Sequence, residues 1–333
     1  MKDLIERVTA WALTLKPVRA FLLYADSRGP MLADSISYRT MFSVFAGVFL
    51  GFSVASLWLA GNPDVLNSLV SVVDAAIPGL LGDQGLIDPK TIQAPAGLTI
   101  TGIVALVALL GAAIGAIGSL RMAFRQLARH VHDDIFWIWV MLRNVVIAIG
   151  IGAAFLASAV ITFYGTAGIG ALTEWLGRGP DDPLTVFSAR ALSIAVVFVL
   201  DALCIGILFR LLSGLKPSAR SLWSGALLGA VALTVLQQLS FLFVGAVSRN
   251  PIYASFASLI ALLVWLNLSA QVILIAGAYI ITGVAEESDR VRARYGARTF
   301  AQRRVRDAED LARLANEELV NARAGEEKER TRG

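Results

Sequence analysis

The chain has 333 residues, of which 56% are hydrophobic and 16% are charged, and its mean hydropathy is +0.69. Soluble globular domains carry about 25% charged residues, so this composition excludes that class and predicts a membrane protein. The formal net charge of +4 gives no argument for a nucleic-acid partner, because a basic excess is also expected of the cytoplasmic loops of membrane proteins.

Residues 1–36 are predicted to form an amphipathic segment on the cytoplasmic side that does not span the membrane. Leu4, Val8, Trp11 and Leu15 recur at helical spacing, while the charged residues lie away from this stripe. Such a helix lies in the headgroup region or packs as a soluble helix on the membrane domain, and both alternatives stay open. Pro17 is expected to break it.

Apolar runs predict about six transmembrane helices in a membrane domain at residues 37–285. The run from Met41 to Ala60 carries no charge and is long enough to cross a hydrocarbon core of about 30 Å. The predicted spans are about 37–60, 97–120, 138–164, 188–212, 221–247 and 252–282. The fold class is therefore all-α, a polytopic integral membrane protein.

The lysines and arginines predict the orientation of these spans. If the chain crosses the membrane six times, 25 of its 29 lysines and arginines fall on the same side of the membrane as the termini. The exceptions are Lys90, Arg178, Arg190 and Arg249. Short loops rich in positive charge stay in the cytoplasm, so both termini are predicted to be cytoplasmic.

Two segments outside the spans are predicted to be helical. Val65 to Ile77, in the first outer loop, has one apolar face and is expected to pack on the membrane surface. The charged tail at 286–333 has a weak stripe of Val305, Leu311, Ala315 and Leu319. It is predicted to be a solvated helix or a disordered tail, with a partner-binding or coiled-coil role as the alternative.

Small residues within the spans predict how the helices pack. Three glycine pairs at i and i+4 allow close approach of helix backbones: Gly47 and Gly51, Gly111 and Gly115, and Gly225 and Gly229. We interpret them as packing surfaces and not as evidence for a dimer. Cys204 is the single cysteine and lies in an apolar run, so a packing role is expected and a disulfide within the chain is excluded.

Polar residues in and beside the spans are the candidate substrate or ion pathway. Asp201 lies near the middle of the fourth span, where a carboxyl group costs about 2.5 to 3.5 kcal/mol on insertion scales. Asn267 and Gln271 share one face of the sixth span, at a depth similar to that of Asp201. The alternative is that the side chains only join helices, at about 0.6 kcal/mol each. The full set is Asp201, Gln237, Gln238, Asn267, Gln271, Asp34, Tyr38 and Arg39.

Two stretches resemble the most recognisable parts of the YihY/BrkB family of envelope proteins: RGPMLADSISYRTMFSVF in the first span and LIALLVWLNLSAQVILIAGAYI in the sixth. The resemblance covers about residues 20–285. It implies a bacterial inner-membrane protein, tied to envelope integrity, that translocates or handles a lipid or other amphiphilic envelope component. A non-transporting scaffold for envelope assembly is the alternative. The chain departs from the family where Ala46 and Gly47 follow Phe45 in place of a proline, and where Tyr279 replaces the usual acid.

Members of this family have also carried a ribonuclease label, which the residues argue against. His130, His132 and Asp134 form an H-x-H-x-D pattern that fits the start of a two-metal site, but the chain has no further histidine and a single cysteine to supply more ligands. Phosphate-binding, dinucleotide-binding and zinc-protease motifs are absent from the sequence. We therefore predict no enzymatic activity, no cofactor, no metal and no nucleic-acid partner. The predicted partners are membrane lipids, a second copy of the chain, and a cytoplasmic protein bound through residues 286–333.

Overall fold

The computed structural model describes residues 2–59, 100–129, 137–175, 182–239, 251–288, 297 and 299–331. All regular secondary structure in these ranges is helical, which confirms the predicted fold class. The helices are α1 (Lys2–Thr14), α2 (Lys16–Asp26), α3 (Gly29–Leu59), α5 (Ile100–Leu127), α6 (Trp137–Trp175), α7 (Pro183–Leu212), α8 (Ala219–Leu239), α10 (Pro251–Ser288) and α12 (Phe300–Arg330). The predicted surface helix from Val65 to Ile77 lies outside the described residues.

The amino-terminal segment forms two helices in place of the single one that the sequence predicts. The chain breaks at Leu15, and α2 begins at Lys16 with Pro17 in its first turn. Proline is favoured there because its missing N–H would have no partner within the helix at that position. The break is therefore where the sequence predicts it, but Pro17 starts a second helix. α2 packs on α10, and its Ala20 and Tyr24 join the buried core.

A tight turn connects α2 to α3. Arg28 adopts a φ of 56°, in the left-handed region. The next residue must be glycine, because a Cβ atom at Gly29 would overlap the ring of Tyr24. Pro30 then lies in the first turn of α3. The RGP sequence thus directs the chain from the α2 segment into the first long helix.

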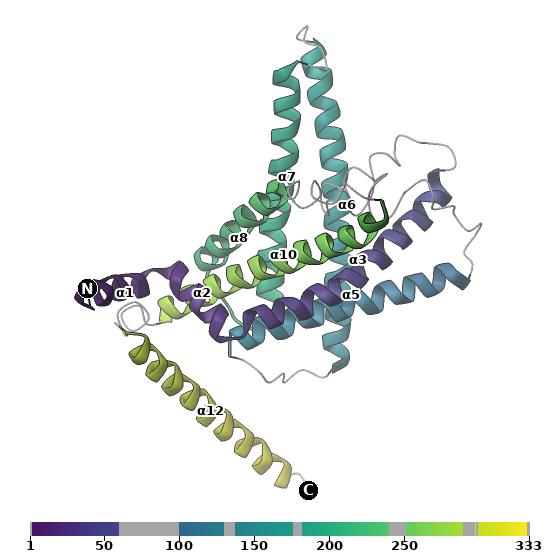
Figure 1. The fold of residues 1–333 in the computed structure, drawn as a ribbon. Helices are drawn as coiled ribbons and strands as arrows, with labels where there is room; N and C mark the ends of the chain where they lie inside the picture. The colour runs from purple at the N-terminus through teal and green to yellow at the C-terminus, as the bar shows by residue number, and fades with distance from the viewer. Residues whose placement is uncertain are drawn as a thin grey trace.

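Helices α3, α5 and α10 lie side by side, and α10 also packs on α8 (Figure 1). Helices α6 and α7 form a long hairpin that crosses this layer steeply in Figure 1. In the core, the rings of Phe124 and Phe209 are fully buried and meet edge to face with their centroids 5.3 Å apart. Cys204 packs against the same core, in line with its predicted packing role.

Close approach of α8 and α10 depends on two of the predicted glycines. A Cβ atom at Gly229 would lie 2.8 Å from the Cβ of Ala276, and one at Gly225 would lie 3.0 Å from the Ala276 carbonyl oxygen. The packing role predicted for this pair is therefore confirmed. At Gly111, by contrast, a Cβ atom would meet no described atom within 4 Å, and one at Gly115 would lie 3.8 Å from the Arg39 side chain, so this pair is less tightly packed.

Five of the described helices are long and apolar enough to cross a membrane. These candidate spans are Val107–Leu127, Ile138–Gly168, Pro183–Leu212, Ala219–Leu239 and Leu259–Glu287, and they overlap the second to sixth predicted spans in order. The first predicted span, about 37–60, falls on α3, whose side chains from residue 49 onward lie outside the described residues. The protein is therefore a polytopic membrane protein, and its orientation stays a prediction.

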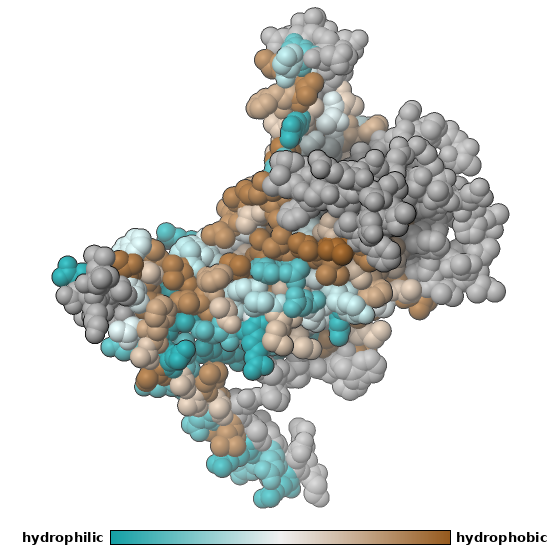
Figure 2. All heavy atoms as spheres, viewed as in Figure 1, coloured by the Kyte–Doolittle hydropathy of each residue, from teal (hydrophilic) through white to brown (hydrophobic). Residues whose placement is uncertain are grey.

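The surface of the helical bundle is strongly apolar. Figure 2 shows hydrophobic residues running across α8 and α10, while hydrophilic residues gather near α2 and the start of α12. Exposed large apolar side chains on these two helices include Trp223, Leu227, Val231, Ile260 and Val264. An apolar surface of this extent favours contact with lipid, because a protein that exposed it to water would tend to aggregate.

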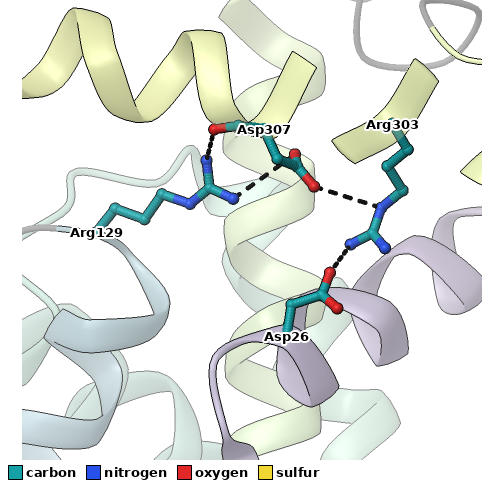
Figure 3. A network of polar contacts seen from close by, with 4 residues as sticks. All are labelled: Asp26, Arg129, Arg303 and Asp307. Atoms are coloured by element: carbon teal, nitrogen blue, oxygen red, sulfur yellow. Dashed lines mark hydrogen bonds and ion pairs between the residues drawn. The ribbon is translucent and has the colours of Figure 1, made fainter. Parts of the chain in front are cut away.

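The charged tail is held to the bundle by a network of arginines and aspartates (Figure 3). The Nη2 atom of Arg303 donates to the Oδ2 atom of Asp26 over 2.5 Å, and its Nε atom lies 3.7 Å from Asp307. Arg129, at the end of α5, donates to the backbone carbonyl of Asp307 over 3.4 Å and lies 3.6 Å from its carboxylate. The helical alternative for the tail is therefore the one observed. Its predicted apolar stripe, including Val305, is exposed.

Candidate functional site

A chain of three predicted polar residues crosses the contact between α3 and α10. The Nδ2 atom of Asn267 donates to the Oδ1 atom of Asp34 over 2.7 Å. One helical turn further along α10, the Nε2 atom of Gln271 donates to the Oδ1 atom of Asn267 over 2.6 Å. Asp34 is exposed and the two amides are half-buried, so this polar chain leads from the surface into the helix contact.

The fourth and fifth predicted spans contribute a second polar group. The Nε2 atom of Gln237, on α8, donates to the Oδ2 atom of Asp201, on α7, over 3.1 Å. Asp201 is half-buried between two apolar helices, where a carboxyl group without a hydrogen-bond partner would be costly. The Gln237 amide supplies that partner. The predicted residues thus form two groups, one on α3 and α10 and the other on α7 and α8.

The remaining three candidates lie at other contacts. Gln238 is exposed, and its Oε1 atom accepts from the Nη2 atom of Arg190 over a long 3.5 Å. The Nη1 atom of Arg39 donates to the carbonyl oxygen of Gly115 over 3.3 Å and so connects α3 to α5. Tyr38 is 59% exposed and meets Phe42 edge to face, with the ring centroids 5.0 Å apart.

Tyr24 is a neighbour of this site that the sequence did not single out. Its side chain is buried, and its hydroxyl group has no hydrogen-bond partner among the described residues. Burial raises the pKa of this hydroxyl above its usual value of 10.0, and the negative charge of Asp34 raises it further. Tyr24 therefore lies close enough to Asp34 for an electrostatic interaction between its hydroxyl group and the Asp34 carboxylate.

Two buried polar residues in α5 and α6 were also missed. Arg121 and Asn144 are each only 3% exposed, although both lie in candidate spans. The predicted span ends at about residue 120, so Arg121 fell just outside it. Leu120, Phe124 and Leu127 recur at helical spacing around Arg121, and all three are buried in the structure. This spacing in the sequence would have extended the predicted helix past residue 120.

The described residues contain no cluster of metal-ligating side chains. In that part of the chain no group of three histidine, cysteine, aspartate or glutamate side chains could hold a metal ion. The histidine motif at 130–134 lies outside it. The groups described above are therefore neutral amides, carboxyl groups and a guanidinium, which bind by hydrogen bonds and charge.

The two quoted stretches supply Asp34 from α3 and Asn267 and Gln271 from α10, so the recognisable sequence and the first polar group coincide. The sequence pattern of the family described as Virulence factor BrkB matches residues 20–299. The chain belongs to the BrkB family. This confirms the resemblance drawn from those stretches, and the match ends directly before α12.

Two curated proteins are similar to the chain over most of their length. An uncharacterized protein of Dickeya dadantii is 25% identical over 83% of this chain and 87% of its own length. The inner membrane protein YhjD of Escherichia coli is 24% identical over 85% of this chain and 86% of its own. No solved structure matches the chain. The protein is thus a distant homologue of an inner membrane protein and carries five candidate spans.

Proposed function

We propose that the protein is a bacterial inner-membrane protein that translocates or handles a lipid or other amphiphilic envelope component, and that it is not an enzyme. The observation that carries this proposal is the polar chain of Asp34, Asn267 and Gln271, which begins at an exposed carboxyl group and enters the α3–α10 contact. An amphiphile needs such a combination, because its polar head requires hydrogen bonds while its tails stay in hydrocarbon.

The apolar surface around this polar chain supports the same interpretation. Exposed Ile260 and Val264 lie on the same helix as Asn267, and Figure 2 shows hydrophobic residues along part of α10. The Asp201–Gln237 pair offers a second carboxyl group on α7 and α8.

The experiment is reconstitution of the purified full-length protein into liposomes, followed by lipid-scrambling and solute-flux assays. We expect scrambling above that of protein-free vesicles, and a loss of this activity in Asn267→Leu. Thr166→Val is the matched control, because Thr166 is also a polar residue in a candidate span but bonds to the Thr162 carbonyl of its own helix. Equal rates in the control and Asn267→Leu vesicles would contradict a role for the polar chain.

A non-transporting scaffold for envelope assembly is the competing proposal. Its support is α12, whose exposed Val305, Leu311 and Leu319 leave apolar side chains available to a cytoplasmic protein or a second copy of the chain. Wild-type vesicles that neither scramble lipid nor pass solute, while deletion of residues 300–331 produces an envelope defect in cells, would favour the scaffold.

A further inference from the structure

A cavity of about 490 Å³ lies beneath α12, at the predicted cytoplasmic end of the bundle. Its walls come from α2, the end of α5, the end of α10 and the first half of α12. This volume is within the range of small-ligand sites, about 300 to 1,000 Å³. Sequence patterns did not reveal it, because it forms between helices that are distant in the chain.

Guanidinium groups dominate the polar lining of this cavity. Five arginines line it, against the two carboxylates of Asp307 and Asp310: Arg19, Arg129, Arg303, Arg306 and Arg313. Arg19 and Arg303 are 8% and 9% exposed, so the positive groups are built into the walls. Each guanidinium carries five donors. Arg303 uses its Nη2 and Nε atoms in ion pairs with Asp26 and Asp307, and Arg313 uses its Nε atom in an ion pair with Glu317, so these contacts occupy part of the five donors of each guanidinium.

The rest of the lining is apolar and lies at the ends of the candidate spans. Leu127 is the last residue of one span, and Ile281 and Ala285 are in the final turns of another that ends at Glu287. Leu23 and Leu314 complete this apolar wall. A site at the end of a span lies at the depth of the lipid headgroups, where basic pockets between helices bind anionic headgroups.

We propose that this cavity binds a phosphate-bearing anion at the depth of the lipid headgroups. Arginine suits this ligand because its planar fork donates two parallel hydrogen bonds to phosphate oxygens. The anion is either the headgroup of a phospholipid or free phosphate. Four of the five arginines lie just beyond the end of α5 or on α12, so the site is separate from the polar residues within the spans. The proposal therefore does not depend on the proposed translocation.

The test uses the purified full-length protein in detergent, with inorganic phosphate as the probe and titration calorimetry as the measurement. The double variant Arg306→Gln/Arg313→Gln removes two lining charges and keeps the Arg303–Asp26 pair. The matched control, Arg304→Gln/Arg323→Gln, removes two exposed charges from the same helix. We expect phosphate to bind at least about tenfold more weakly to the first double variant and to change by less than about twofold in the control.

A second variant guards against a folding defect. Ala128→Trp fills the cavity without changing any charge, and it should weaken phosphate binding as well. Protein in nanodiscs of phosphatidylcholine, with or without phosphatidylglycerol, distinguishes the sources. Loss of phosphate binding in the presence of phosphatidylglycerol assigns the site to a lipid headgroup, and unchanged binding assigns it to free phosphate. Wild-type protein that binds neither probe, or equal losses in the two double variants, would overturn the proposal.

Discussion

The ammonium nitrogen of Lys16 lies 4.0 Å from the centroid of the Tyr279 ring. This contact joins the start of α2 to α10 at the position where the family resemblance implies an acid. An acid there would hold Lys16 by charge, whereas the tyrosine holds it through the electrostatic attraction of a cation to the ring face. Burial lowers the pKa of Lys16, and the nearby Glu286 and Glu287 oppose that shift.

Replacement of Tyr279 tests this contact. Tyr279→Leu should destabilise the protein by about 0.5 to 2 kcal/mol beyond the change in packing, whereas Tyr279→Phe keeps the ring face and should stay near wild type. The measurement is the midpoint of thermal unfolding in detergent. A Phe variant as unstable as the Leu variant would show that the tyrosine hydroxyl, and not the ring, is the stabilising group.

Tyr24→Phe tests the buried hydroxyl beside Asp34. Because the folded state raises the pKa of Tyr24, its stabilising contribution is fully present below about pH 10 and is lost as the pH rises through the folded value. The variant cannot titrate, so its stability should decline less steeply than that of wild type as the pH rises above about 10. At neutral pH the two proteins should unfold at similar temperatures, since the hydroxyl has no partner among the described residues. Identical alkaline declines would contradict the assignment.

Asp201→Asn separates a transport role from a packing role. An asparagine keeps the size of the side chain and can still bond to Gln237, so insertion and fold should be preserved. If the carboxyl group carries a proton or contacts substrate, the transport rate should fall more than about tenfold, which corresponds to about 1.4 kcal/mol. Gln237→Leu should be less damaging. A fully active Asp201→Asn protein in the liposome assay would leave Asp201 a packing role alone.

Gly229→Ala should loosen the contact of α8 with α10. The added Cβ atom would lie 2.8 Å from both the Ala276 Cβ atom and the Ile205 Cδ1 atom, so the helices must move apart at a cost of about 1 to 3 kcal/mol. Gly111→Ala is the control, since no described atom lies within 4 Å of its Cβ position. That variant should be neutral or slightly stabilising. Equal unfolding temperatures for the two variants would contradict the packing assignment.

The sequence predicted the helices well where long apolar runs define them, and less well where charge and burial conflict. The end of α5 was placed at residue 120 because Arg121 follows, yet the helix continues to Leu127 with Arg121 buried. Charge alone is a poor boundary signal when apolar residues keep their helical spacing around it.

The candidate site was predicted in part. Asp34, Asn267 and Gln271 were selected because polar groups in or beside apolar helices are costly, and the structure brings them together. Their pairing was not predictable, since it depends on the register of α3 against α10. The cavity was missed for the same reason. Arg303 and Asp26 meet across 277 residues of chain, and no local pattern links them.

The Arg303–Asp26 pair also sets the order of assembly. Asp26 leaves the ribosome before the candidate spans, whereas Arg303 emerges after they have been synthesised. The tail can therefore dock on α2 only after the intervening helices have been made. This contact therefore forms after the other helices have been made. A protein truncated before residue 300 would lack α12, which lines one cavity together with α2 and the end of α5.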